Sequence, residues 1–254
     1  MAVATRRNLV GLIGAAAEET PAQRLLRLVA RPCVYQRSWW EFAGLCVTKD
    51  EARSRVAPMP RWPYLREIGD AIITEKLLMV AKSRRVLASW LSCIMDVWLV
   101  SGGQDRRWPA LMYGTSNRVV VILSRKLEGP QSSSWFLQER VRFIVDQLEA
   151  NGIREKWPTF PTWEWTHTEA RLSNGGRILA IAQGPDQARG LSALAFHVEE
   201  LAHIEDAKKT IEAILPTLFA QDETAGHLYA LCTAAVGTFA ADIYLDQLDD
   251  TSWR

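Results

Sequence analysis

Five short apolar runs, most of them separated by longer helical segments, restrict the fold of this chain more than any other feature. The runs occupy residues 77–81, 118–124, 177–182, 191–198 and 227–232. The run at 118–124, Arg-Val-Val-Val-Ile-Leu-Ser, is rich in β-branched residues and is typical of a strand buried on both faces. Strands that alternate with helices indicate an α/β fold with a mostly parallel central sheet flanked by helices.

The segments between the runs predict helices. Residues 86–100 are apolar nearly all round, which indicates a buried helix, whereas residues 132–148 have the spacing of an amphipathic helix. A further helix is expected from about Ile204 to Leu215, ended by Pro216, and a last one from Thr233 to about Leu248.

A β-hairpin extends the predicted sheet. Residues 162–172 alternate in polarity, and Asn174-Gly175-Gly176 forms a tight turn into residues 177–182. The domain organisation follows from the same reading. Residues 1–60 are expected to form a helical and irregular lead-in that packs on the core, with short helices and loops from Arg31 to Pro63, and residues 61–254 form the core.

Composition excludes several classes of protein. Of the 254 residues, 48% are hydrophobic and 23% charged, as in ordinary globular domains, and the net charge of +1 gives no general basic field. Any contact with DNA is therefore expected to be local, and weak for the isolated domain. The scattered cysteines predict reduced thiols, and the apolar run at residues 9–17 is too short to span a bilayer. We therefore expect a cytoplasmic protein that is neither secreted nor bound to a membrane.

The segment between the first apolar run and the buried helix resembles a phosphate-binding loop. In the pattern GxxxxGK[ST], the first glycine falls on Lys82, the second on Leu87, the lysine on Ala88 and the hydroxyl residue on Ser89. The candidate nucleotide-binding residues are Lys82, Ser83, Arg84, Arg85, Val86, Leu87, Ala88 and Ser89.

Lys82 can reach the phosphates from the other side of this loop, and the amino end of the following helix offers free N–H groups. Ser89 Oγ is expected to hold Mg²⁺, and Arg85 adds positive charge at the phosphates. Taken alone, the segment is better explained as a solvated basic turn between strand and helix, because such turns are common and this one contains no glycine.

An acidic pair ends the fourth apolar run. An apolar strand followed by Glu199-Glu200 has the Walker B arrangement, in which the first acid binds Mg²⁺ and the second acts as the general base. The first acid of such sites is usually aspartate, so Glu199 is a departure that adds one methylene group. The alternative is an acidic pair that opens a helix. A third signal is the loop at residues 182–190, whose Arg189 serves the same site or a neighbouring subunit's, unless the loop is a plain surface loop.

In this order, the segments resemble the ATPase domain of the large terminase subunit of tailed phages, the motor that packages DNA into the prohead. The resemblance extends over residues 60–245, and KSRRVLASW is similar to the deviant Walker A of lambda-type terminases, in which lysine occupies the first position. The matching strings are WPYL (62–65), KSRRVLASW (82–90), VVVILSRK (119–126), GGRILAIAQGPDQARG (175–190), HVEELAH (197–203) and CTAAVGTF (232–239).

The resemblance implies a P-loop NTPase of the ASCE type that hydrolyses ATP with Mg²⁺ and drives viral double-stranded DNA into the prohead. It implies these roles: Lys82 and Arg85 on phosphate, Ser89 and Glu199 on Mg²⁺, Glu200 as catalytic base, Thr233 as coupling residue, and Arg189 as a trans-acting or sensor arginine. Implied partners are DNA, the portal protein, the small terminase subunit and further copies in a ring on the prohead, in the cytoplasm of a bacterial host.

Two features depart from the family pattern. Leu87 replaces a glycine that lets the backbone approach phosphate closely, and no Asp-rich strand ends remain to build the family's nuclease domain, which we expect to be absent from this chain. Two other functions are possible. One is a helicase-like remodeller, and the other is a degenerate P-loop domain that binds nucleotide or assists assembly without hydrolysis.

Overall fold

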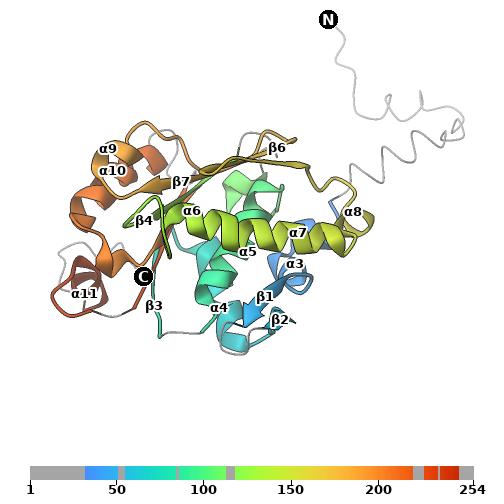
Figure 1. Cartoon of the computed structure of the whole chain (residues 1–254), viewed down its shortest axis with the longest axis horizontal. Coiled ribbons are helices and arrows are strands. Elements are labelled where there is room, and N and C mark those ends of the chain that lie inside the picture. Colours follow the sequence, from blue (N-terminus) through green and yellow to red (C-terminus); the bar gives the residue numbers. More distant parts are fainter. Residues whose placement is uncertain are drawn as a thin grey trace, which may run out of the picture. The chain divides into compact units, whose positions relative to one another are not determined.

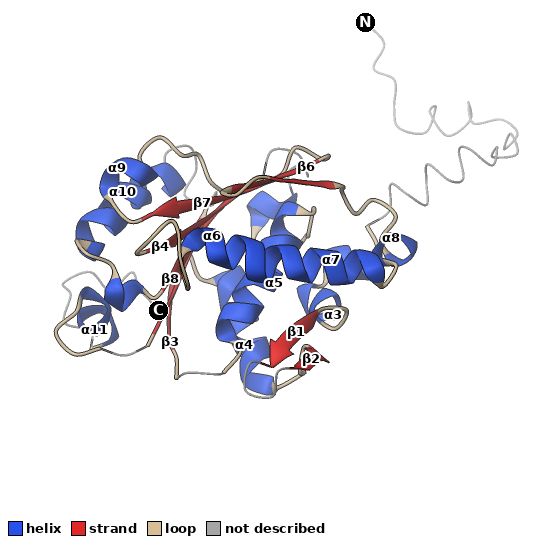
Figure 2. Cartoon of the chain, viewed as in Figure 1, coloured by secondary structure: helices blue, strands red, loops and turns tan. Residues whose placement is uncertain are grey.

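Seven strands form one sheet, most of it parallel (Figures 1 and 2). The computed structural model describes residues 32–50, 55–83, 86–112, 118–219, 226–233 and 235–245. In sheet order the strands are β3 (Leu77–Ala81), β9 (His227–Cys232), β8 (Ala195–Glu199), β4 (Val119–Ser124), β7 (Arg177–Ala182), β6 (Glu169–Leu172) and β5 (Trp163–Trp165). Neighbours from β3 to β7 pair in parallel, and β6 and β5 continue the sheet antiparallel. The predicted α/β fold with a hairpin extension is confirmed.

Both faces of the sheet are covered, because its strands are apolar on both sides (Figure 2). On β9, Tyr229 and Leu231 face one core, and Leu228, Ala230 and Cys232 face the other. The first core is lined by α3 (Trp39–Ala43), α4 (Pro63–Thr74), α5 (Ala88–Val100), η1 (Pro109–Met112), η2 (Phe136–Arg142), α7 (Phe143–Ala150) and α8 (Ile153–Lys156). The second is lined by α9 (Pro185–Ala188), η3 (Leu201–His203), α10 (Ala207–Phe219) and α11 (Phe239–Tyr244).

Helix α5 lies at the centre of the first core. Every residue of α5 except Ser89 is buried, as the apolar composition of this segment predicts. The helix begins at Ala88, two residues later than the sequence pattern suggested, because Leu87 has left-handed backbone angles. The hairpin turn packs against the other end of α5, where the Asn174 side-chain amide donates to the Val100 carbonyl at 2.9 Å.

The segment before α4 contains strands that the sequence analysis missed. Besides α2 (Val34–Arg37) and α3, it forms an antiparallel hairpin of β1 (Val47–Asp50) and β2 (Arg55–Pro58), separate from the main sheet. The expectation of helices and loops only was wrong here, because β1 is short and polar and its strand conformation depends on pairing with β2. The helix expected in residues 1–30 lies outside the described residues, and the domain boundary at residue 60 stays a prediction.

Two helices differ in detail from their predictions. Residues 133–150 are helical throughout, but η2, between α6 (Ser133–Trp135) and α7, is a π-helix. Pro216 lies inside α10 rather than ending it. The helix continues through this proline because Ile211, Ile214 and Leu218 are buried in the second core. Residues 246–254, the end of the expected last helix, lie outside the described residues.

No helix in the described part of the chain is both long enough and apolar enough to cross a membrane.

A buried histidine marks the amino end of β9, opposite the end that carries the acidic residues. The rings of His227 and Trp108 stack with centroids 3.7 Å apart, and His227 Nδ1–H donates to the Ile72 carbonyl at 3.0 Å. Burial lowers the pKa of His227 from 6.5 to about 4, against the smaller opposing effect of the hydrogen bond to Ile72. His227 is therefore neutral in the folded protein at pH 7.

We predict that the free energy of unfolding falls as the pH drops from about 6.5 to about 4. Below pH 6.5 the unfolded chain protonates His227 and the folded chain does not, so stability present above 6.5 is lost, by up to about 3 kcal/mol. Urea unfolding at several pH values measures this slope. His227→Asn, which keeps a donor but does not titrate, should flatten it, and an unchanged slope would show that His227 does not contribute.

Candidate functional site

The polar residues singled out in the sequence lie at one edge of the sheet. Lys82 directly follows β3, Glu199 is the last residue of β8 and Thr233 directly follows β9. Since β9 pairs in parallel with both β3 and β8, these three strands end at the same edge. Ligands bind at this edge in open α/β sheets.

Two side-chain contacts join the loop before α5 to the end of β8. Lys82 Nζ lies 3.0 Å from Glu200 Oε1, and Ser89 Oγ donates to Glu199 Oε2, also at 3.0 Å. The contacts connect residues that are 118 and 110 positions apart in the chain. The side chains of Lys82 and Glu200 are 11% and 25% exposed, so this ion pair is shielded but reachable from solvent. The fold therefore brings the basic loop and the acidic pair together.

Leu87 has the backbone conformation that glycine favours. Its φ of 59° and ψ of 8° are left-handed, and it stands directly before the first residue of α5. For a residue with a Cβ this conformation costs roughly 1–2 kcal/mol. Two contacts hold the segment in place: Leu91 N–H donates to the Leu87 carbonyl at 2.9 Å, and Tyr64 Oη donates to the Val86 carbonyl at 3.1 Å. The loop thus keeps a glycine-type turn without the glycine.

Glu200 has the same unusual backbone conformation on the other side of the site. Its φ is 54° and its ψ is 50°. Among the described residues other than glycine, positive φ occurs at Leu87, Gln131, Glu200 and Asp206. Two of these four residues belong to the candidate site. Strained backbone of this kind gathers at functional sites, where the surrounding contacts enforce it.

Behind Glu199 lies a buried polar network that the sequence analysis missed. His197 Nδ1 lies 2.7 Å from Asp96 Oδ2, and its Nε2 lies 3.1 Å from Glu199 Oε1. Tyr229 Oη donates a short hydrogen bond to Asp96 Oδ1. All four residues are fully buried. The chain of contacts runs from Ser89 through Glu199, His197 and Asp96 to Tyr229.

The spacing of these residues in the sequence could have revealed the network. His197 and Glu199 are two apart on β8 and share one face of the strand, while Ser89 and Asp96 are seven apart on α5 and share one face of the helix. Polar residues on one face of an otherwise apolar helix and strand were the available signal. Tyr229 is the neighbour of His197 on β9.

The charges of the network determine each other's protonation. Burial alone lowers the pKa of His197, but Asp96 and Glu199 outweigh it and raise this pKa to about 9. Burial raises the pKa of Glu199, but hydrogen bonding to His197 and the positive charges around it lower it overall. Burial and Asp96 together raise the pKa of Tyr229 well above its ordinary value. The site therefore contains an ionised Glu199 and a neutral Tyr229.

Two oxygen atoms of the site, Ser89 Oγ and Glu199 Oε2, are of the kind that magnesium prefers. Mg²⁺ prefers oxygen ligands at about 2.1 Å in octahedral geometry, which sets adjacent ligands about 3 Å apart. Ser89 Oγ and Glu199 Oε2 are joined by a hydrogen bond of 3.0 Å, so both oxygens are close enough to bind one ion. Cys93, Asp96 and His197 also place possible ligand atoms within 4.8 Å of one another. We read that group as part of the hydrogen-bond network, because Asp96 and His197 bind each other and burial raises the pKa of Cys93 well above its ordinary value.

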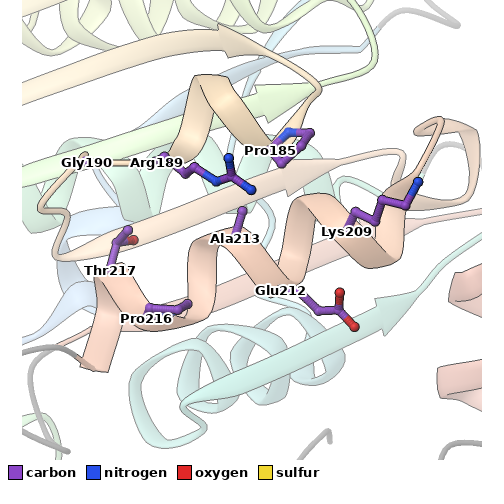
Figure 3. A pocket seen from close by; sticks show the side chains of 8 residues that line it. All are labelled: Pro185, Arg189, Gly190, Lys209, Glu212, Ala213, Pro216 and Thr217. Atoms are coloured by element: carbon purple, nitrogen blue, oxygen red, sulfur yellow. The ribbon is translucent and has the colours of Figure 1, made fainter.

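Other candidate residues lie apart from these contacts. Arg189 ends the loop that contains α9; it pairs with Asp186 at 2.9 Å and its side chain is 67% exposed. Its guanidinium lines an open groove between α9 and α10 (Figure 3); the lining residues are Pro185, Arg189, Gly190, Lys209, Glu212, Ala213, Pro216 and Thr217. No contact described for Arg189 reaches Lys82 or Glu200. Thr233 is half-buried and Ser83 exposed, and Arg84 and Arg85 lie outside the described residues.

Comparison with known proteins gives a match in structure but not in sequence. No protein-family model matches the chain, and no curated protein is similar to it. The crystal structure of the HK97 bacteriophage large terminase matches with a TM-score of 0.58 and 13% identity, over 85% of this chain and 41% of that one. The chain thus shares its fold with a phage large terminase, as the resemblance in the sequence predicts, and corresponds to less than half of that protein's length.

Two further structures are similar at a lower level. The large terminase ATPase domain of Thermus phage P74-26 has a TM-score of 0.48 at 16% identity, over 70% of this chain and 68% of that one. The N-terminal domain of the DNA packaging ATPase of bacteriophage phi29 has a TM-score of 0.43 at 9% identity, over 71% and 84%. Both scores are too low to add to the comparison with HK97.

We predict that Leu87→Gly is more stable than Leu87→Ala by about 1 kcal/mol in free energy of unfolding. Both variants lose the same side-chain packing, but only glycine adopts the left-handed conformation without cost. Urea unfolding measures the difference. At Glu67, an exposed position of α4 with ordinary helical backbone, the same pair should show the opposite order. Alanine more stable than glycine at both positions would contradict the conformation of Leu87.

Proposed function

We propose that this chain binds ATP and Mg²⁺ with the segment Lys82–Ser89 and hydrolyses ATP with Glu200 as the general base. The observation that carries the proposal is the meeting of Lys82 with Glu200 and of Ser89 with Glu199 at the carboxyl edge of a parallel sheet. A basic loop, a hydroxyl group at the start of a helix and two acids are the parts that a P-loop NTPase requires. Here they are contributed by segments more than a hundred residues apart.

Geometry supports the proposed roles of Lys82, Ser89 and Glu199, whereas those of Arg85 and Thr233 rest on the resemblance in the sequence. Lys82 Nζ and the N–H groups at the amino end of α5 bind the phosphates, and the Leu87 side chain has no polar group that would cap these N–H groups. Ser89 Oγ and Glu199 would hold Mg²⁺, which would supply positive charge to stabilise the phosphates during transfer. Arg85, outside the described residues, adds charge at the phosphates, and Thr233 couples hydrolysis to movement.

The ion pair between Lys82 and Glu200 provides a way to control the base. Lys82 Nζ lies 3.0 Å from the Glu200 carboxylate and is its ion-pair partner. Phosphate oxygens offer Lys82 a competing negative partner, so Glu200 is released to accept a proton from the attacking water. Binding of nucleotide thereby precedes activation of the base.

We further propose that hydrolysis drives viral double-stranded DNA into a prohead. The shared fold with the HK97 large terminase supports this proposal. The partners would be DNA, the portal protein, the small terminase subunit and further copies of the chain in a ring, in the cytoplasm of a bacterial host. The net charge of +1 suits weak, local contact between DNA and a single copy.

One observation favours a second candidate, a degenerate P-loop domain that binds nucleotide without hydrolysis. Glu200 is engaged by Lys82, and the loop lacks both glycines of the usual pattern. In this alternative the ion pair persists when nucleotide is bound, and the chain serves as a binding or assembly module. Binding with no turnover would identify this case.

Millimolar Mg-ATP should raise the melting temperature of the wild-type chain by several degrees. A ligand at 100 times its Kd adds about 2.7 kcal/mol of stability, and about 2–4 °C per kcal/mol is typical of domains of this size. Glu200→Gln should keep this shift but lose turnover by about 100-fold or more, because it keeps the shape and removes the base. Lys82→Ala should lose both.

Two charged residues off the site serve as matched controls. Lys76 is exposed at the amino end of β3, and Glu205 pairs with Arg125 at an exposed position. Lys76→Ala and Glu205→Gln should leave turnover unchanged. The absence of any thermal shift with Mg-ATP in the wild type would rule out nucleotide binding. Full activity of Lys82→Ala would show that the loop is a surface turn that does not bind phosphate.

Arg189 is proposed to complete the site of a neighbouring copy, because it is exposed and no contact described for it reaches the site of its own chain. Arg189→Ala and Glu200→Gln should each be inactive alone, and a mixture should recover part of the turnover at concentrations where chains associate. The mixed ring pairs an intact Glu200 with an intact Arg189. Arg66→Ala, another exposed arginine with an ion pair, is the control. No recovery on mixing, with turnover per chain independent of concentration, would reject the role in trans.

A further inference from the structure

Three fully buried residues have no part in the chemistry proposed above. Asp96, His197 and Tyr229 lie inside the first core, where ionised groups are expensive to bury unless they are paired. Apolar residues of similar size fill such positions at no loss of stability in many proteins. A reason other than stability is therefore needed for this group.

The geometry of His197 indicates what the group does. Each ring nitrogen of His197 has its own carboxylate partner, so the ring is held from both sides. His197 reaches Asp96 with Nδ1 at 2.7 Å and Glu199 with Nε2 at 3.1 Å. Tyr229 Oη donates to the second oxygen of Asp96, which fixes this carboxylate in turn. The ring of His197 is thereby held in one orientation.

The fixed ring of His197 gives the two oxygens of Glu199 different partners. His197 binds Oε1, and Oε2 is left facing Ser89 Oγ at 3.0 Å. Most acidic pairs of this kind begin with aspartate, and glutamate adds a methylene group and a rotatable bond. A longer side chain loses more rotamer freedom when it is fixed. The hydrogen bond with His197 offsets the entropy cost of fixing this side chain. It also leaves Oε2 directed toward Ser89 Oγ, where Mg²⁺ would bind.

We propose that His197, oriented by Asp96 and Tyr229, is a positioning residue that fixes the Glu199 carboxylate for Mg²⁺. This inference rests on the proposed nucleotide site. It adds the residue that orients one of the proposed Mg²⁺ ligands, Glu199. Partners of this kind orient ligands, and their loss typically weakens metal binding about 10–100-fold.

Two substitutions of His197 separate the positioning role from a purely structural one. The amide nitrogen of glutamine lies near the place of Nε2, so His197→Gln keeps a donor to Glu199. The amide nitrogen of asparagine lies near the place of Nδ1, so His197→Asn keeps the contact to Asp96 and loses the one to Glu199. Both variants disturb the same buried site, but only one of them releases Glu199.

The measurement is the Mg²⁺ concentration that gives half of the thermal stabilisation by ADP, at a fixed ADP concentration. His197→Asn should raise this concentration about tenfold or more, and His197→Gln by less than about threefold. ADP binding in the presence of EDTA should be the same in all variants. Ile94→Val, a loss of one methylene group from the same core, is the control for general destabilisation and should leave the Mg²⁺ dependence unchanged.

Each outcome decides between the two proposals. Equal Mg²⁺ dependence in His197→Asn, His197→Gln and wild type would overturn the positioning role, even if the wild type hydrolyses ATP. If the Mg²⁺ dependence changes only in His197→Asn and the wild type shows no turnover, the positioning role is supported and hydrolysis is overturned. No Mg²⁺-dependent stabilisation in the wild type would overturn both.

Discussion

The parallel pairing of β9 with β3 on one side and β8 on the other is the constraint on which the site depends. It aligns the carboxyl ends of three strands, so that Lys82, Glu199 and Thr233 leave the sheet at one edge. Strand β9 lies between β3, which leads into the basic loop, and β8, which ends at the acidic pair. Its width sets the separation that Lys82 and Ser89 bridge to reach the two acids.

Two structural costs are concentrated around this edge. Leu87 and Glu200 have left-handed backbone conformations, each unfavourable for a residue with a Cβ. Asp96, His197 and Glu199 place polar, ionisable side chains in a fully buried region. A chain selected for stability alone would avoid both. Gln131 and Asp206 share the left-handed conformation elsewhere, but the two kinds of cost coincide at this site, which is the physical argument that it has a function.

The departures from the usual phosphate-binding pattern have structural counterparts. Leu87 replaces a glycine but keeps its turn, and Glu199 replaces an aspartate but is held by His197. Each replacement therefore comes with a contact that preserves the geometry. The loop was a weak signal when considered alone, and its contacts with the acidic pair are what distinguish it from an ordinary basic turn.

The amino-acid sequence by itself determined the alternation of strands and helices, the burial of α5 and the polar residues that follow β3 and β8. These depend on local patterns: apolar runs, helical spacing, and the side of a strand on which a residue falls. The same local signals failed for β1, which needs its partner strand, and for Pro216, where burial of α10 outweighs the proline.

Only the tertiary structure decided that β9 lies between β3 and β8, that Leu87 adopts a left-handed conformation and that His197 meets Asp96. Strand order and contacts between residues more than a hundred positions apart depend on how both cores pack, which no local pattern contains.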